Sequence, residues 1–451
     1  MKEIIKIASG QGFWGDLPKA PVDQVKKGKI DYLVLDYLAE VTMSIMQKQR
    51  AKNPKHGYAL DFPPIVEAVF DDIIQKGVKV VTNAGGVNPH SCKNDLLERA
   101  NRAGVKIKVA VVDGDDLMSS IKDLLNDGHQ LKNMDTDEPI RSIMDQILSA
   151  NVYFGAKPIV EALQTGADVV ITGRVTDTGL TLGPMIHEFG WSFDDYDKMA
   201  SGTIAGHIIE CGAQASGGNF TDWKRIPNMA DIGFPIIEAM SDGTFYVTKH
   251  ANTGGCVDVM TVSEQLMYEI GDPKSYITPD CVADFTSIQL EQESENQVFV
   301  SGIKGYAETE FYKVSISYKD GFKMSSTLVY CWPDAIEKAH NAAQILKQRA
   351  NDLGLDIQRF RSELVGFNSC NELNIPSSDE YNEVQLRISA SSKSETDLNR
   401  LGREIAPLIL TGPSGVTGFA GGRPKASEIV AYWPALLSKK AVKPKVHFFS
   451  N

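Results

Sequence analysis

The first half of the chain alternates short apolar runs with segments that read as helices. The intervening segments 39–52, 61–77, 94–104 and 158–166 have helical character, and Pro63, Pro64 and Gly77 suit the start and end of the second. Strand-like runs of Val, Ile and Leu occupy residues 4–9, 32–38, 78–83, 107–113 and 167–173. Continuous apolar strands between helices predict an α/β fold with a largely parallel sheet and flanking helices.

The second half has a different pattern. Residues 284–306, 313–331 and 383–392 alternate apolar and polar positions, which predicts half-exposed antiparallel strands. Helical segments at residues 334–354 and 396–410 would cover them. The turn-forming stretch 271–281 is the expected boundary. We therefore predict an α/β domain over residues 1–275, with glycine-rich site loops, and an α+β domain over residues 276–451.

Composition limits the class of partner. The 451 residues are 42% hydrophobic and 23% charged, as in an ordinary globular protein, and the net charge is −12. That charge argues against nucleic acid and anionic membranes as partners, because both attract basic surfaces. The six cysteines are spread singly, and no apolar run has the length of a membrane span. We expect a cytoplasmic protein with free thiols and a small anionic substrate.

Glycine-rich segments mixed with reactive side chains recur along the chain. Glycine clusters mark tight turns or the close approach of backbone to a ligand. Three of the segments directly follow predicted strands, so their loops should meet at one edge of a parallel sheet, where α/β proteins bind ligands. The segments are residues 9–16, 82–92, 172–179, 207–223, 249–258 and 411–424.

None of these loops carries a nucleotide-binding signature. The loop at residues 9–16 lacks GxGxxG spacing, and Pro18 and Pro21 interrupt the helix that would face a pyrophosphate. No GxxxxGK[ST] occurs either. The cofactor therefore stays unknown.

Two segments offer groups for acid–base chemistry. Asp36 and Glu40 are four residues apart just after a strand, where they could act as acid and base or simply form a charge pair at a helix start. His207, Glu210 and Cys211 share one face if their segment is helical. They could hold a metal, or Glu210 and Cys211 could serve as base and nucleophile. We assign no metal ligand.

Other residues are candidates for binding an anionic group. Arg174 could clamp a carboxylate or phosphate, with Asp177 orienting it, or the two could only order their loop. His250 could transfer protons, or form an ordinary hydrogen bond beside a turn. The remaining candidates would contact or orient the substrate, with glycine amides forming an anion-binding nest: Asn83, Asn219, Asp222, Lys249, Thr253, Gly254, Gly255 and Arg423.

Several long segments together resemble the acyclic terpene utilisation family over nearly the whole chain. They include ASGQGFWGD, NAGGVNP, ITGRVTDTGLTLGP, GHIIECGAQASGGNFTDW and TGFAGGRP. The resemblance implies breakdown of branched acyclic terpenoids or other branched carboxylic acids through acyl-CoA intermediates. Some longer relatives carry an extra small domain, which implies that a separate small subunit could join a homo-oligomer here.

These observations lead to three hypotheses. The first is a catabolic lyase or hydratase acting on a branched acid or acyl-CoA, with Asp36, Glu210 and His250 moving protons and Cys211 as a possible nucleophile. The second is a non-catalytic acyl-binding subunit, and the third is a metal-dependent hydrolase. Convergence of Asp36, Glu210 and His250 on one pocket would favour catalysis.

Overall fold

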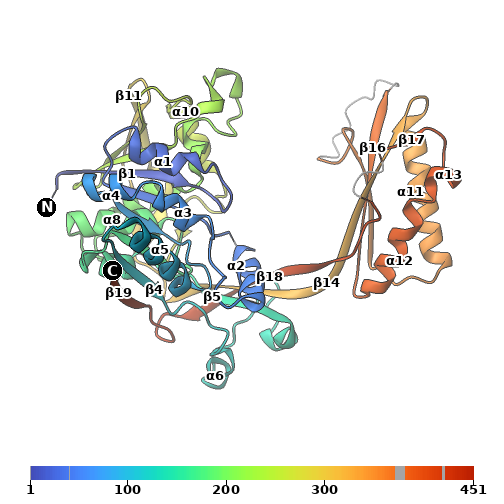
Figure 1. Ribbon diagram of the computed structural model, residues 1–451, viewed down its shortest axis with the longest axis horizontal. Helices are drawn as coiled ribbons and strands as arrows, with labels where there is room; N and C mark the ends of the chain where they lie inside the picture. Colours follow the sequence, from blue (N-terminus) through green and yellow to red (C-terminus); the bar gives the residue numbers. More distant parts are fainter. Residues whose placement is uncertain (1, 40, 371–380, 419–421) are drawn as a thin grey trace. The chain divides into compact units, whose positions relative to one another are not determined.

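The protein consists of two compact units, seen here in a computed structural model that describes residues 2–39, 41–370, 381–418 and 422–451. Unit 1 contains the chain up to residue 317 together with residues 432–451, and unit 2 contains residues 318–431. Unit 2 is therefore an insertion in the sequence of unit 1 (Figure 1). The stretch 271–281, where a boundary was expected, lies within unit 1.

Unit 1 is built on a ten-stranded mixed sheet. Its centre is parallel, in the order β1, β2, β3, β6, β4. These strands span Ile4–Gln11, Tyr32–Leu35, Lys79–Thr82, Val169–Thr172 and Lys108–Asp113. Each corresponds to an apolar run in the sequence, and β2 and β6 are buried at every position. Burial on both faces explains why these runs lack polar alternation.

Antiparallel strands extend the sheet at both edges. Beside β1 lie β7 (Pro235–Met240), β8 (Phe245–Lys249), β12 (Gln297–Ser301) and β11 (Gln289–Ser294), and beside β4 lies β19 (Lys445–Ser450). The α/β class is confirmed, but the sheet is mixed instead of largely parallel. The difference arises because segments expected in a second domain, including β11 and β12, pair with this sheet.

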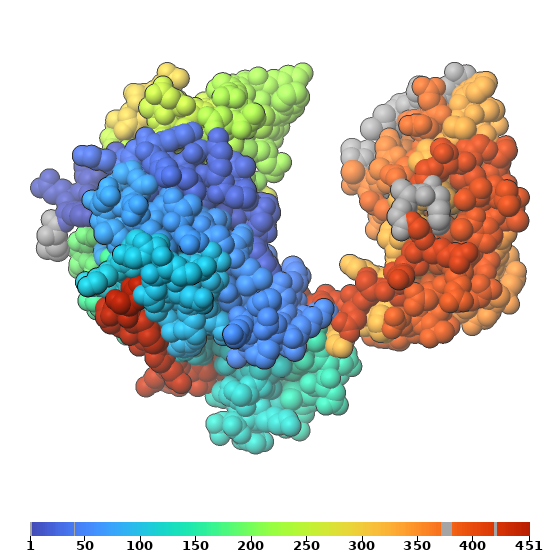
Figure 2. Space-filling view, in the orientation of Figure 1, coloured from blue at the N-terminus to red at the C-terminus, as the bar shows by residue number. Residues whose placement is uncertain are grey.

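Helices cover both faces of the sheet. One layer contains α3 (Phe62–Glu67), α4 (Phe70–Lys76) and α5 (Pro89–Ala103), whose apolar residues join Leu33, Val80 and other strand residues in one core. The other layer contains α7 (Lys157–Gln164), α8 (Gly179–Phe189) and α9 (Tyr196–Glu210), which contact the strands and one another. In Figure 2, the blue surface of the early part of the chain occupies the middle of the visible side of unit 1.

The segment 61–77 forms two helices where one was predicted. α3 ends at Glu67, and Val69 has φ −132° and ψ 17°, outside the helical range, before α4 begins. Gly77 ends α4 in the left-handed conformation, with φ 69°, as its position suggested. Short helices of unit 1 also include α1 (Lys19–Lys26), α2 (Thr42–Lys52), α6 (Ile121–Asn126) and α10 (Val259–Met267).

Unit 2 has its own sheet and core. β16 (Glu383–Ser392) pairs antiparallel with β15 (Arg359–Val365) and with the second half of β14 (Phe311–Cys331). The long helix α11 (Ala335–Asp352), with α12 (Glu395–Ile405) and α13 (Leu408–Thr411), contributes the other half of the core. β17 (Val416–Thr417) and β18 (Ser427–Ser438) also pair with β14.

The structure bears on two expectations from composition, which concern the cysteines and membrane-spanning segments. All six cysteines are free thiols, as their single spacing predicted. Among the described residues, no helix has the length and apolar character needed to cross a membrane.

Candidate functional site

A cavity of about 370 Å³ lies where β1, β2 and β6 end. The first glycine loop, the segment after β2, the loop after β6 and the end of α9 all contribute to its wall. Two of the three glycine loops expected at one sheet edge, those after β1 and β6, line this cavity, whereas no residue of the third loop, residues 82–92, does so. The cavity is lined by Gly12, Phe13, Asp36, Leu38, Ala39, Asp177, Glu210, Cys211, Gln214, Tyr268 and Glu269.

A second cavity of about 270 Å³ adjoins the first. The two share Asp177, Glu210 and Glu269 in their walls. The second also presents two cations, two tyrosines and a histidine. Its remaining lining residues are Tyr153, Arg174, Thr176, Thr178, His207, Tyr276, Ile277, Thr278, Pro279 and Lys313.

Asp36 is held in a buried position by its neighbours. Its Oδ1 accepts hydrogen bonds from the Leu38 amide at 3.1 Å and from Asn83 Nδ2 at 2.7 Å. Asn83 Oδ1 in turn accepts from the Tyr37 amide at 2.7 Å. Burial, together with the negative charge of Asp177, raises the pKa of Asp36 well above 3.8 despite the nearby Arg174. This carboxyl group is therefore suited to hold a proton.

Arg174 is a buried cation with a fixed orientation. Nη1 donates to the Leu38 carbonyl at 2.8 Å, and Nη2 lies 3.1 Å from Asp177 Oδ1. Its guanidinium carbon lies 4.1 Å from the centre of the Tyr153 ring, and its amide donates to Asp115. The pair with Asp177 suggested by the sequence is thus present, and it orients Arg174 in the cavity wall.

His207 and Glu210, one turn apart at the end of α9, form a hydrogen-bonded pair. His207 Nδ1 lies 2.9 Å from Glu210 Oε1, and Nε2 lies 3.0 Å from the Gln265 carbonyl. Because a carbonyl can only accept, Nε2 carries a hydrogen, and one further proton is shared between Nδ1 and the carboxyl group. The pair is therefore either imidazolium with carboxylate or imidazole with carboxylic acid.

Burial acts on both members of this pair. It raises the pKa of Glu210 despite the opposing effect of His207. Burial alone would lower the pKa of His207, but the charge and hydrogen bond of Glu210 outweigh it, so the pKa lies above 6.5. Both shifts act in the same sense, because each favours the protonated form of its group.

Cys211 lines the larger cavity but is not poised as a nucleophile. Burial, followed by the charge of Glu210, raises the pKa of its thiol to about 12. The side chain therefore remains a neutral thiol at physiological pH, and the thiolate needed for attack or for metal binding is disfavoured.

The fifth glycine loop lies away from these cavities. His250 and Thr253 line a separate small cavity, and His250 Nε2 bonds to the Gln24 carbonyl at 2.9 Å. Burial lowers the pKa of His250, so it is an ordinary satisfied histidine beside a turn. The structure thus does not bring His250 together with Asp36 and Glu210.

The backbone amides that were expected to bind an anion in that loop already donate hydrogen bonds to carbonyl groups of the protein. The amides of Gly254 and Gly255 donate to the carbonyls of Asp231 and Pro227, each at 2.8 Å. Lys249 Nζ donates to the Thr253 carbonyl at 2.9 Å. These groups close their own loop, which leaves the amides no hydrogen for an anion.

The other residues predicted to contact the substrate do not line either cavity. Asn219 is exposed, and its Nδ2 bonds to Gln214 of the larger cavity at 3.1 Å. Asp222 is exposed and pairs with Arg225, and Arg423 is exposed in unit 2. Glu40 lies outside the described residues, so its expected pairing with Asp36 has no structural counterpart here.

Sequence reasoning missed several cavity residues. Tyr153, Glu269, Tyr276 and Lys313 line the second cavity, but none stands in a motif that distinguishes it from a surface residue. Glu269 adopts a left-handed backbone, with φ 55°, which no residue pattern announced. His207 was considered only as a metal ligand, although its spacing of three from Glu210 also permits the observed hydrogen bond.

The structure is thus that of an α/β protein with two adjoining cavities, lined by polar and charged side chains, at a strand-terminal edge of its sheet. A comparison with curated proteins found no match. Residues 5–448 match the family described as acyclic terpene utilisation family protein AtuA. The chain belongs to this family, which implies involvement in acyclic terpene utilisation.

Proposed function

We propose that the protein is a lyase or hydratase that performs acid–base chemistry on a branched carboxylic acid or its acyl-CoA thioester. The observation that carries the proposal is that Asp36 and Glu210 line one cavity, and that Glu210, hydrogen-bonded to His207, also lines the adjoining cavity. Addition of water beside a carbonyl needs a base, an acid and positive charge near the developing enolate. Arg174 and Lys313 supply that charge.

The hydration direction assigns each group a role. With Glu210 as carboxylate, it takes a proton from water while the water oxygen bonds to the β-carbon of an unsaturated acyl group. The electron pair of the double bond moves onto the carbonyl, forming an enolate beside the cations. Protonated Asp36 then donates to the α-carbon. The reverse sequence eliminates water, and in both directions His207 tunes the proton affinity of Glu210 through their hydrogen bond.

The cavity volumes bear on the substrate. The larger cavity, of about 370 Å³, lies near the lower end of the usual range for ligand pockets, about 300–1,000 Å³, and the smaller, of about 270 Å³, lies below it. Such space suits a short branched acyl group better than an entire thioester with its nucleotide. The acyl portion would occupy the cavities while a carrier, if present, remained outside.

Incubation with a panel of branched saturated, unsaturated and hydroxylated acids and their CoA thioesters tests the proposal. Mass spectrometry should detect gain or loss of one water with the wild type. Glu210→Gln and Asp36→Asn should each reduce turnover at least about 100-fold. Asp222→Asn, which changes an exposed carboxyl group that lines neither cavity, serves as the matched control. Wild-type turnover in both cavity variants would exclude these groups as the acid and base.

A binding function is the second candidate. Arg174 Cζ lies 4.1 Å and Lys313 Nζ lies 5.2 Å from the centre of the Tyr153 ring. Two cations beside one ring could bind an acyl carboxylate without any reaction. Calorimetry would distinguish the two. Tight binding of an acid that is recovered unchanged, with equal affinity in Glu210→Gln, would favour a non-catalytic subunit.

A further inference from the structure

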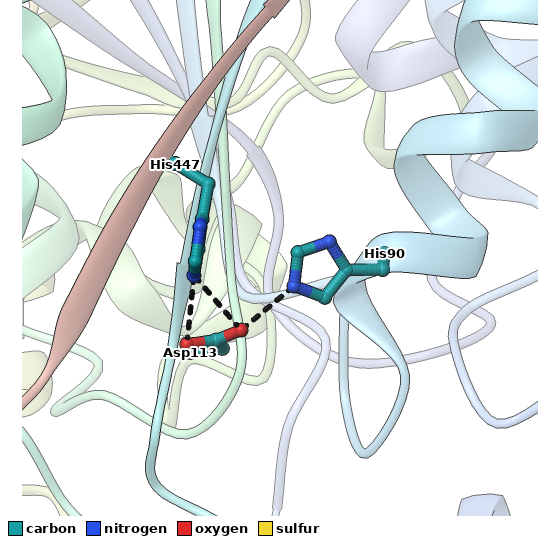
Figure 3. A group of neighbouring side chains, drawn as sticks. All are labelled: His90, Asp113 and His447. Carbon is teal, nitrogen blue, oxygen red and sulfur yellow. Dashed lines mark hydrogen bonds and ion pairs between the residues drawn. The ribbon is translucent and has the colours of Figure 1, made fainter.

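A second cluster of reactive side chains lies in unit 1, apart from the cavity residues described above. His90 is on α5, Asp113 ends β4 and His447 is on β19, so residues widely separated in sequence meet at one point. Figure 3 shows the two imidazole rings directed at the carboxylate from different elements. Within the described parts of the chain, no other three His, Cys, Asp or Glu residues gather their ligand atoms so closely.

The spacing of the ligand atoms fits a metal ion. His447 Nε2 lies 3.3 Å from each oxygen of Asp113, and His90 Nε2 lies 2.7 Å from Oδ2. Ligands at about 2.0–2.1 Å around a tetrahedral ion are separated by roughly 3.3 Å. The contacts between His447 and Asp113 match that separation, and all three donor atoms lie within 4.8 Å of one another. To admit an ion, His90 must move outward from Asp113, because their 2.7 Å contact is shorter than the separation of two ligands on one ion.

The chemistry of the donors narrows the class of ion. Two imidazole nitrogens and one carboxylate oxygen suit zinc and its neighbours among the divalent transition metals, whereas calcium and magnesium prefer oxygen alone. The three side chains are between 24% and 43% exposed, so an ion could enter from solvent. Three protein ligands leave at least one coordination position for water.

We propose that His90, Asp113 and His447 form a binding site for a divalent transition metal ion of the zinc class. The ion would fasten β19, the strand at one edge of the main sheet, to the neighbouring β4 and to the first turn of α5. Figure 2 shows the red surface near the C-terminus beside the blue surface of the early helices, where this connection would form. The proposal is independent of the acid–base function, because none of the three residues lines either cavity.

The test uses full-length protein without a histidine tag, freed of metal by a chelator. Titration with Co²⁺ should reach one ion per chain and produce the visible absorption of a nitrogen- and oxygen-ligated site. Zn²⁺ should displace the Co²⁺ and raise the melting temperature by about 5 °C or more at saturating concentration. His90→Gln and His447→Gln should each weaken binding at least 10-fold and remove most of the thermal shift.

Two further variants make the outcome decisive. Asp113→Asn keeps the shape of the side chain but loses the anionic donor, and should also lose binding. His340→Gln changes an exposed histidine of unit 2 and should bind as the wild type does. Equal binding in the wild type and in the His90 and His447 variants, or wild-type binding only at millimolar Co²⁺, would overturn the proposal. Hydrogen exchange in β19 of each metal-free variant verifies that the strand is still paired.

Discussion

At the scale of single residues, the site depends on carboxyl groups placed where their charged forms are unfavourable. Asp36 is the clearest case, because it is buried, faces Asp177 and still has a raised pKa beside Arg174. A group that must ionise during a reaction commonly lowers the stability of the folded protein, because its site does not favour the charged form. The cost should be measurable in the wild-type protein.

We predict that Asp36→Asn stabilises the protein increasingly as pH rises. Because the pKa of Asp36 is raised on folding, its favourable contribution is complete below about pH 4 and is lost as pH rises through the folded value. Asparagine has no ionisation and can still accept the bonds from Leu38 and Asn83. Urea unfolding should show near-equal stability at pH 4 and an advantage of about 1–3 kcal/mol for the variant at pH 8.

Asp222→Asn is the control, since an exposed carboxyl group should give little difference at either pH. A constant difference between Asp36→Asn and the wild type across this range would show that ionisation of Asp36 is not the cause. Loss of turnover together with gained stability would connect the residue to function.

The sequence identified the residues that follow strands better than those that depend on tertiary packing. Asp36, Asn83, Arg174, Asp177 and Glu210 meet at one site because strand ends and a helix end converge there. His250 stands in an equally suggestive motif, but its loop follows an antiparallel strand and folds back on Gln24. His250 therefore lies away from the site because the strand before it, β8, runs antiparallel to its neighbours. Local residue patterns do not encode the direction of a strand.

At the scale of elements, the site depends on how closely α8 and α9 approach. Gly202 and Gly206 lie one turn apart on α9 and face α8 and the residue before it. A Cβ atom at Gly206 would stand 2.6 Å from both the Cα and the carbonyl oxygen of Thr178. Since His207 follows directly, this contact sets the position of the His207–Glu210 pair relative to the cavity loop.

Gly206→Ala should therefore destabilise unit 1 by about 1–3 kcal/mol, despite the better helix propensity of alanine. The clash involves backbone, so relief requires displacement of α9, and turnover should fall as well. Thermal unfolding and turnover measure the two effects. Gly271→Ala, where a Cβ meets nothing within 4 Å, is the control and should change neither. If Gly206→Ala changed neither thermal stability nor turnover, α8 and α9 could move apart without loss of stability.

The elements themselves were largely predictable, whereas their partners were not. Buried runs of Val and Ile located β1, β2, β3, β4 and β6 because both faces of these strands are covered. The alternation in β11 and β12 was also correctly interpreted as antiparallel strand. Their addition to the first sheet depends on contacts between distant segments, and β19 was not foreseen at all.

At the scale of the whole molecule, two units have separate hydrophobic cores. Leu346 of α11 is fully buried among residues of unit 2, and Leu96 of α5 is fully buried in unit 1. We therefore expect each unit to have a local stability of its own. The boundary expected at residues 271–281 could not reveal this, because unit 1 resumes after unit 2 ends.

Leu346→Ala should lower the stability of unit 2 by about 2–5 kcal/mol through loss of buried contacts and creation of a cavity. Hydrogen exchange followed by mass spectrometry should show faster exchange in residues 335–365 and unchanged protection in β1, β2 and β3. Leu96→Ala should give the reverse pattern. If both substitutions accelerated exchange equally throughout the chain, the two units would unfold as one.

The return of the chain to unit 1 also affects the order in which the protein can be completed during its synthesis. β4 is made early, but its partner β19 emerges from the ribosome only after all of unit 2. Until then, one edge of the growing sheet has unpaired backbone groups exposed, a condition that favours pairing with other chains. The growing chain is therefore vulnerable to aggregation at this edge until β19 has emerged and paired with β4.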